Sequence, residues 1–186
     1  MSLAAGWQIR LRRRYAVGEH NYEITELPET SFRPVVLGDW RQCLGADFSG
    51  DAEYRVEFDF HGTLDGCFVL NLGKVCYAVA ITLNGKKLGN AIWPPFQINA
   101  TGAVQTGRNV LVLTVTNSLA NAILAEGVAE TWQQRCGREW PDIKYAYHQR
   151  QLEFEKDSLP SGLFGPVRLL QGVQPCPCRH LEHMEK

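Results

Sequence analysis

The chain has 186 residues, a formal net charge of -1 at pH 7 and a pI near 6.5. Its length fits one domain, and 45% hydrophobic residues with 21% charged residues exclude a wholly disordered chain. A charge near zero gives no general attraction to phosphate groups, so we expect no nucleic-acid partner. The sequence has no run of about 20 apolar residues, so we also expect no segment that crosses a membrane.

The N-terminal residues predict strands with charged faces. In residues 8–14, Ile9 and Leu11 alternate with a run of arginines, which is typical of the solvated face of an edge strand. The run consists of Arg10, Arg12, Arg13 and Arg14. Further strands are expected over residues 22–26 and 32–37. The N-terminus lacks the apolar stretch of a signal peptide, and we expect a fragment of a longer protein, so the compartment stays undetermined.

Alternation of apolar and polar residues marks the central strands. Residues 52–60 place aromatic and aliphatic side chains on one edge and charged side chains on the other. Residues 109–117 repeat this pattern with Leu and Val opposed by β-branched residues. Residues 67–72 and 76–83 are nearly continuous apolar runs, which predicts central strands covered on both faces.

Turn residues separate these strands and define the fold class. Asn84 and Gly85 can adopt the two positive φ angles of a tight type I′ turn, so we expect a hairpin there. Short strands are also expected over residues 96–98 and 167–170. Many short strands with no long amphipathic helix predict an all-β fold, a two-sheet β-sandwich of the jelly-roll type.

The longest stretch between strand candidates covers residues 118–160. Connections of this length are usually functional or disordered, and its large apolar side chains favour order because they need a surface to pack on. Near-helical spacing of apolar residues predicts a short helix within residues 119–135. We expect one domain over residues 1–174, with this long aromatic-rich loop, and a flexible tail over residues 175–186.

The spacing of the six cysteines matches no disulfide scaffold or zinc motif. Cys67 and Cys76 lie in apolar runs and are expected as small core residues. Cys176 and Cys178 lie near two histidines, but a Cys-x-Cys pair is a weak metal signal.

Four short motifs follow one another in a recognisable order along the chain. They are Leu37-Gly38-Asp39-Trp40, Leu83-Asn84-Gly85-Lys86, Trp93-Pro94-Pro95-Phe96 and Ser161-Gly162-Leu163-Phe164. In this order they resemble landmarks of the galactose-binding-like jelly-roll domains, a sugar-binding fold, of glycoside hydrolase family 2. They are similar in the same way to domains of rhamnosidase-type enzymes in glycoside hydrolase family 106. The resemblance spans roughly residues 35–171.

The resemblance implies a non-catalytic domain that binds carbohydrate and accompanies the catalytic domain of a larger glycoside hydrolase. Two alternatives stay open: a purely structural domain that packs on a catalytic barrel, and a glycosidase in its own right. Catalysis requires two carboxylates about 5–10 Å apart across a cleft. A linear sequence cannot pair the carboxylates of the long loop, so no catalytic residue is assigned. These carboxylates are Glu126, Glu130, Glu139, Asp142, Glu153, Glu155 and Asp157.

Aromatic residues are the candidates for carbohydrate binding, because a ring can stack on the C–H face of a sugar. The candidates in the loop are Trp132, Trp140, Tyr145, Tyr147 and His148. The alternative is that these rings only hold the loop against the sandwich. Trp93 is the first candidate outside the loop, since the resemblance puts its turn at the sandwich rim. Even so, we expect Trp40 and Trp93 to fill the two sandwich ends as core.

The resemblance also implies that a structural calcium ion can accompany this type of sandwich. Calcium takes six to eight oxygen ligands, and the densest group of acidic residues before the long loop could supply some of them. This group is Asp39, Asp47, Asp51 and Glu53. No other cofactor is expected.

Overall fold

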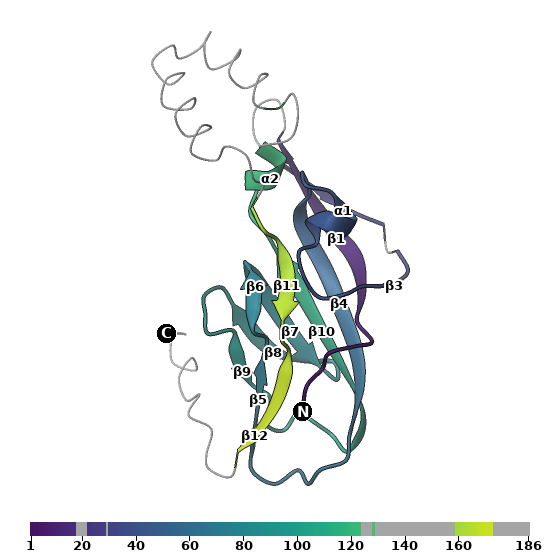
Figure 1. Ribbon diagram of the computed structural model, residues 1–186, viewed down its shortest axis with the longest axis vertical. Helices are drawn as coiled ribbons and strands as arrows, with labels where there is room; N and C mark the ends of the chain where they lie inside the picture. The colour runs from purple at the N-terminus through teal and green to yellow at the C-terminus, as the bar shows by residue number, and fades with distance from the viewer. Residues whose placement is uncertain (18–21, 29, 124–127, 129–158, 173–186) are drawn as a thin grey trace.

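The computed structural model describes residues 1–17, 22–28, 30–123, 128 and 159–172, which form two packed β layers (Figure 1). The predicted all-β sandwich is confirmed. The helices with described bounds are short: α1 (Arg41–Leu44) and α2 (Ala120–Ile123) lie at the same end of the sandwich in Figure 1.

The larger layer is a seven-stranded antiparallel sheet with the order β2-β1-β4-β10-β7-β8, to which β3 adds by pairing with β1. Its strands are β1 (Gln8–Val17), β2 (Tyr22–Glu26), β3 (Arg33–Pro34), β4 (Ser49–Phe60), β7 (Ala78–Leu83), β8 (Lys86–Ala91) and β10 (Gly107–Thr116). The two longest strands, β4 and β10, pair along their length and form the middle of the sheet.

The smaller layer is built from two chain segments that pair twice. β5 (Cys67–Asn71) pairs with β9 (Gln97–Asn99) and with β12 (Arg168–Gly172). β6 (Lys74–Cys76) then pairs with β11 (Gly162–Gly165), so the same two segments continue side by side. Between the pairings, Gly73 has φ +66°, and a Cβ there would lie 2.2 Å from the Gly165 carbonyl oxygen. This close approach requires glycine at position 73.

The core lies between the layers and follows the predicted alternation. The odd-numbered side chains from Glu53 to Asp59 are half-buried or exposed, whereas Tyr54, Val56, Phe58 and Phe60 are buried. In β10, Leu111, Leu113 and Val115 are fully buried. Phe60 of β4 meets Phe68 of β5 edge-on with ring centroids 5.3 Å apart, so aromatic packing joins the two layers.

The predicted hairpin is confirmed between β7 and β8. Asn84 and Gly85 have φ angles of 53° and 77°, and Leu83 pairs with Lys86. The side-chain nitrogen Nδ2 of Asn84 donates to the Ala103 carbonyl and to Asn109 Oδ1, each at 2.8 Å. Its side chain therefore ties the turn to the loop before β10.

The prediction that the arginine run belongs to an edge strand is wrong. β1 lies inside the sheet, between β4 on one side and β2 and β3 on the other. The reason is cross-strand charge pairing, which sequence alternation does not show. Arg10 Nε lies 2.7 Å from Glu53 Oε2, Arg13 Nε lies 3.1 Å from Asp51 Oδ2, and Arg14 pairs with Asp47.

Other strand predictions change in detail. The run over residues 76–83 divides at Tyr77 into β6 and β7, and β7 alternates between buried and more exposed positions instead of being covered on both faces. The strand expected over residues 32–37 shortens to β3, because Pro34 lacks the N–H that a longer ladder needs. Within the expected helix at 119–135 the structure gives α2; residues 124–127 and 129–135 lie outside the described part, as does the expected tail at 175–186.

No helix among the described residues is both long enough and apolar enough to cross a membrane.

Candidate functional site: the rim cleft

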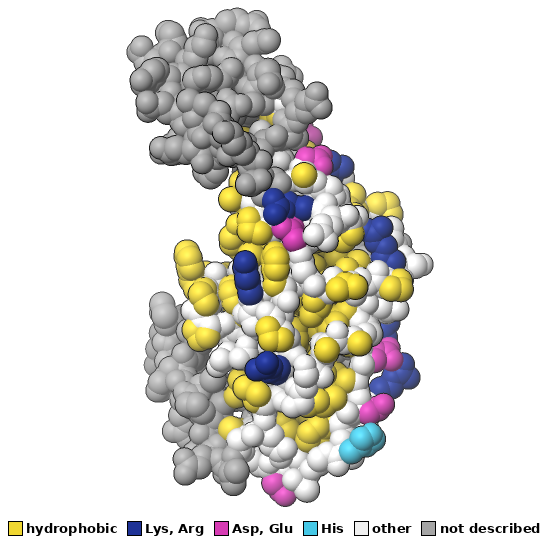
Figure 2. Space-filling model, viewed as in Figure 1, with side chains coloured by type: hydrophobic (Ala, Val, Ile, Leu, Met, Phe, Trp, Pro, Cys, Tyr) yellow, Lys and Arg dark blue, Asp and Glu magenta, His cyan; other side chains and the backbone are white. Residues whose placement is uncertain are grey.

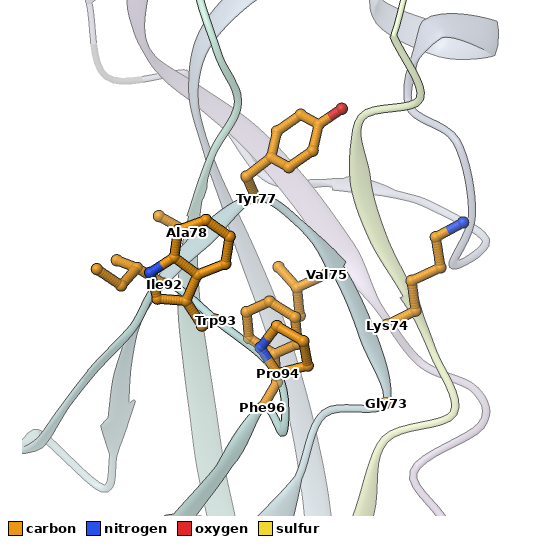
Figure 3. Close-up of a pocket in the computed structure, with 9 residues that line it drawn as sticks. All are labelled: Gly73, Lys74, Val75, Tyr77, Ala78, Ile92, Trp93, Pro94 and Phe96. Atoms are coloured by element: carbon orange, nitrogen blue, oxygen red, sulfur yellow. The ribbon is translucent and has the colours of Figure 1, made fainter.

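A cleft of about 590 Å³ opens at one rim of the sandwich (Figure 3). We call it the rim cleft. Nine described residues line it: Gly73, Lys74, Val75, Tyr77, Ala78, Ile92, Trp93, Pro94 and Phe96. They come from β6 with Gly73 before it and Tyr77 after it, from the start of β7, and from the loop over residues 92–96 between β8 and β9.

The position of this loop follows from the sheet topology. β8 is the last strand of the larger sheet and β9 is the last strand of the smaller one, so the loop crosses from one layer to the other. The Leu72 amide donates to the Phe96 carbonyl, and the Gln97 amide donates to the Pro95 carbonyl, both at 2.8 Å. Pro94 and Pro95 restrict φ at two adjacent positions, so the wall of the cleft is pre-ordered.

Two large apolar side chains at the mouth of the cleft are exposed. Trp93 exposes 77% of its surface and Ile92 exposes 63%, whereas Phe96 at the end of the same loop is buried. The expectation that Trp93 fills a sandwich end as core is therefore wrong. Phe96 fills the core from this loop, which leaves Trp93 at the surface. The matching expectation for Trp40 is confirmed, since only 1% of its surface is exposed.

The polar groups of the cleft are few and mostly directed away from it. In Figure 3 the side chains of Lys74 and Tyr77 extend away from Trp93. The Lys74 amino nitrogen lies 4.6 Å from the centre of the Phe164 ring, a cation–π contact. Burial raises the pKa of the Tyr77 hydroxyl, with a further contribution from Cys76, so this group is neutral at pH 7. Burial likewise raises the pKa of the Cys76 thiol.

The chemistry of the cleft is mainly apolar. The nine described lining residues include no carboxylate, the group that supplies the acid and the base in most glycosidases. An exposed indole beside an apolar cleft is a platform for a ligand with a flat apolar face. Figure 2 shows hydrophobic side chains spread over the face that carries the smaller sheet, with isolated basic side chains between them.

Of the predicted carbohydrate-binding residues, only Trp93 is among the residues that the structure describes. Trp132, Trp140, Tyr145, Tyr147 and His148 lie outside the described residues, so their roles stay predictions. Tyr77, Ile92 and Phe96 line the cleft and were not among the sequence candidates. Ile92 carried a usable signal, because two large apolar residues directly before two prolines are poorly placed to continue a strand.

The four acidic residues considered for calcium each pair with an arginine instead. Asp39 pairs with Arg41 and the others pair with arginines of β1. Within the part of the chain that the structure describes, no three His, Cys, Asp or Glu side chains gather in a way that could hold a metal ion. Asp39, Asp47, Asp51 and Glu53 therefore form cross-strand or local ion pairs and are not brought together as a ligand set.

The fold and the cleft define a two-layer β-sandwich domain with an apolar rim site, and proteins that share this fold have been solved. A rhamnosidase from Novosphingobium sp. PP1Y superposes on 91% of this chain with a TM-score of 0.60 at 24% identity. A β-D-mannosidase from Dictyoglomus thermophilum aligns with 92% of the chain at 18% identity, but its TM-score of 0.48 is too low to support an argument.

A sequence relative gives a similar result. A Formosa agariphila protein with a provisional name as a β-glucuronidase is 30% identical over 139 residues, which cover 66% of this chain. The chain spans only 12% of the length of that protein and 14% of the rhamnosidase. No known protein-family profile matches the chain. The comparisons therefore show a fold found as one part of much longer proteins that are named as glycosidases.

Proposed function

We propose that this chain is a non-catalytic accessory domain of a multidomain glycoside hydrolase and that it binds carbohydrate at the rim cleft. The observation that carries the proposal is the Trp93 indole, 77% exposed at the mouth of a cleft of about 590 Å³. The glycosidase names of the relatives, and the small share of their length that this chain spans, support the accessory role.

The physical basis is stacking. One face of a pyranose ring presents C–H bonds, and an exposed indole supplies a large rigid surface for them. A shallow site of this kind exchanges sugar–water for sugar–protein hydrogen bonds with little net gain. We therefore expect weak binding, with a Kd of roughly 10 μM to 1 mM.

The aromatic residues of the long loop form the second part of the proposal. Trp132, Trp140, Tyr145, Tyr147 and His148 are proposed to contact carbohydrate as well, and the catalytic domain of a longer chain is the proposed protein partner. The loop contribution is tested separately from the cleft, by replacing Trp132, Trp140 and Tyr147 one at a time. A loss of affinity without a change in melting temperature would support it.

The main test is a titration of the domain with an array of oligosaccharides, followed by calorimetry on any that bind. Trp93→Ala should weaken binding at least tenfold, and Trp93→Tyr should restore part of it because it keeps an aromatic face. Ile24→Ala is the matched control, since Ile24 is also exposed (51%) but lies on β2, at the opposite edge of the larger sheet. Absence of binding at millimolar concentrations across the array would remove the carbohydrate-binding role.

A second candidate is a structural domain whose rim cleft packs against a neighbouring catalytic domain. The observation that favours it is the shortage of polar groups in the cleft, because sugar hydroxyls need hydrogen-bond partners when they are buried. In that case Trp93→Ala should lower the melting temperature of the full-length protein and leave the isolated domain unchanged. Equal melting temperatures of the full-length wild type and the full-length Trp93→Ala variant would count against this candidate.

Catalysis by this chain alone is the third possibility and has its own assay. We expect no release of nitrophenol from a panel of aryl glycosides. Release that is abolished by changing one loop carboxylate to its amide would reverse this expectation.

A further inference from the structure

Several backbone groups around the rim cleft are already used in hydrogen bonds within the fold. Pro94 and Pro95 have no N–H group, and the carbonyls of Pro95 and Phe96 already accept hydrogen bonds from Gln97 and Leu72. The Tyr77 amide donates to the Thr116 carbonyl at 2.9 Å. The Gly73 amide donates to Asn71 Oδ1 at the same distance. These main-chain groups on both sides of the cleft are thus committed to the fold.

The side chains offer little more. Six of the nine lining residues carry no polar side-chain atom: Gly73, Val75, Ala78, Ile92, Pro94 and Phe96. The Lys74 amino group lies over the Phe164 ring. The remaining polar groups are the Tyr77 hydroxyl and the Trp93 indole N–H. A free sugar that entered this cleft would lose hydrogen bonds to water and find few side-chain partners to replace them.

The cleft is large enough for an apolar group bigger than a single benzene ring. An apolar cavity of about 150 Å³ is enough to hold benzene. A cleft of about 590 Å³ therefore has room for an aromatic group of more than one ring. Its walls combine the aromatic rings of Trp93 and Phe96 with aliphatic side chains, the surface on which planar apolar groups pack best.

We propose that the ligand of the rim cleft is an aryl glycoside, whose aromatic group enters the cleft while its sugar ring stays at the mouth beside Trp93. This inference rests on the proposed carbohydrate-binding function and names its ligand class. The exposed Trp93 supplies the sugar platform, and the apolar cleft behind it supplies the selectivity for the attached aromatic group.

The test compares matched probes by calorimetry: the methyl, phenyl and 2-naphthyl glycosides of glucose, glucuronic acid and rhamnose, together with phenol alone. The phenyl glycoside should bind at least about tenfold more tightly than the methyl glycoside of the same sugar, because it buries a ring. The naphthyl glycoside should bind more tightly still. In Ile92→Ser the preference for phenyl over methyl should fall below threefold, while Ile24→Ser should keep it. Both isoleucines are exposed, so both variants should fold.

The outcomes separate the two proposals. Equal affinity for methyl and phenyl glycosides would overturn the aryl-glycoside inference and leave carbohydrate binding standing. Phenol that binds as tightly as phenyl glycosides, with no binding of methyl glycosides, would overturn the carbohydrate-binding function and this inference with it. Failure of every probe to bind at millimolar concentration would have the same consequence for both.

Discussion

Trp40 and Trp93 lie in two regions of the sandwich, and the first is buried whereas the second is exposed. The Trp40 ring is 1% exposed and meets Phe48 edge-on, with ring centroids 5.6 Å apart. Its backbone amide donates to the Ser161 carbonyl at 2.8 Å. Trp93 lies on the rim loop with 77% of its surface exposed. Burial of Trp40 contributes to stability, whereas the exposure of Trp93 leaves a surface available for binding.

Polar anchoring distinguishes the Trp40 region further. The side chains of Asn117 and Asn121 both donate to Ser161 Oγ, at 3.0 and 3.1 Å. The Asn121 side chain also makes two hydrogen bonds to the Leu159 backbone. Its Nδ2 donates to the Leu159 carbonyl, and its Oδ1 accepts from the Leu159 amide. These contacts hold residues 117–121 beside residues 159–161. Hydrogen bonds between described residues therefore join these two segments next to Trp40.

The largest expected effect is at the buried aromatic residues. Trp40→Ala and Phe58→Ala should each lower the free energy of unfolding by about 3–5 kcal/mol, because each leaves a cavity. Trp40 Nε1 has no hydrogen-bond partner among the described residues, so packing dominates its contribution. Trp40→Phe should therefore cost clearly less than Trp40→Ala. Urea denaturation measures all three, and a Trp40→Ala variant as stable as the wild type would contradict the burial.

The strands that could be predicted are those whose own residues alternate regularly or flank a recognisable turn. β4, β10 and the β7–β8 hairpin were predictable, because alternation and the Asn84-Gly85 turn depend on local residues. The interior position of β1 was not, since its arginines are satisfied by acids from other strands. β11 contains two glycines and only two apolar residues, so its pairing with β6 depends on the tertiary fold rather than on its own pattern.

The candidate site was only partly predictable for a related reason. The family resemblance put the turn of Trp93 at the sandwich rim, but whether the side chain of Trp93 points inward depends on which neighbour fills the core. Phe96 takes that place. Lining residues such as Val75 and Ala78 come from strands more than 10 positions away and carry no signal of a cleft in their own sequence.

The second expected effect concerns the anchor at Asn117. Its amide oxygen accepts a hydrogen bond from Gly50, and its amide nitrogen donates to the Phe48 carbonyl, at 2.8 and 2.9 Å in a buried setting. Asn117→Ala should cost about 2–3 kcal/mol, because it leaves buried backbone groups without partners. Asn90→Ala is the matched control, since Asn90 is exposed on β8. Equal stability of these two variants would show that the anchor contributes little.

A smaller effect depends on pH through Asp39. Burial alone would raise the pKa of Asp39, but hydrogen bonds from Arg41 and Ser161 lower it below the usual value. The carboxylate therefore stabilises the fold above pH about 4, and this contribution is lost as the pH falls through the lowered pKa. Asp39→Asn should cost about 1 kcal/mol at pH 7. The difference from wild type should shrink between pH 4 and pH 2, roughly the range below the carboxyl pKa in unfolded chains. A pH-independent difference would contradict the assignment.

The smallest expected effect on stability is at Trp93, although its effect on binding is expected to be the largest. Trp93→Ala removes a mostly exposed ring, so the free energy of unfolding should change by less than about 0.5 kcal/mol. Phe96→Ala, three positions along the same loop, is the matched control. It should cost about 3 kcal/mol because Phe96 is buried. If Trp93→Ala destabilised the isolated domain as much as Phe96→Ala, the Trp93 ring would belong to the core. The contrast between a packed sandwich end and an open rim would then fail.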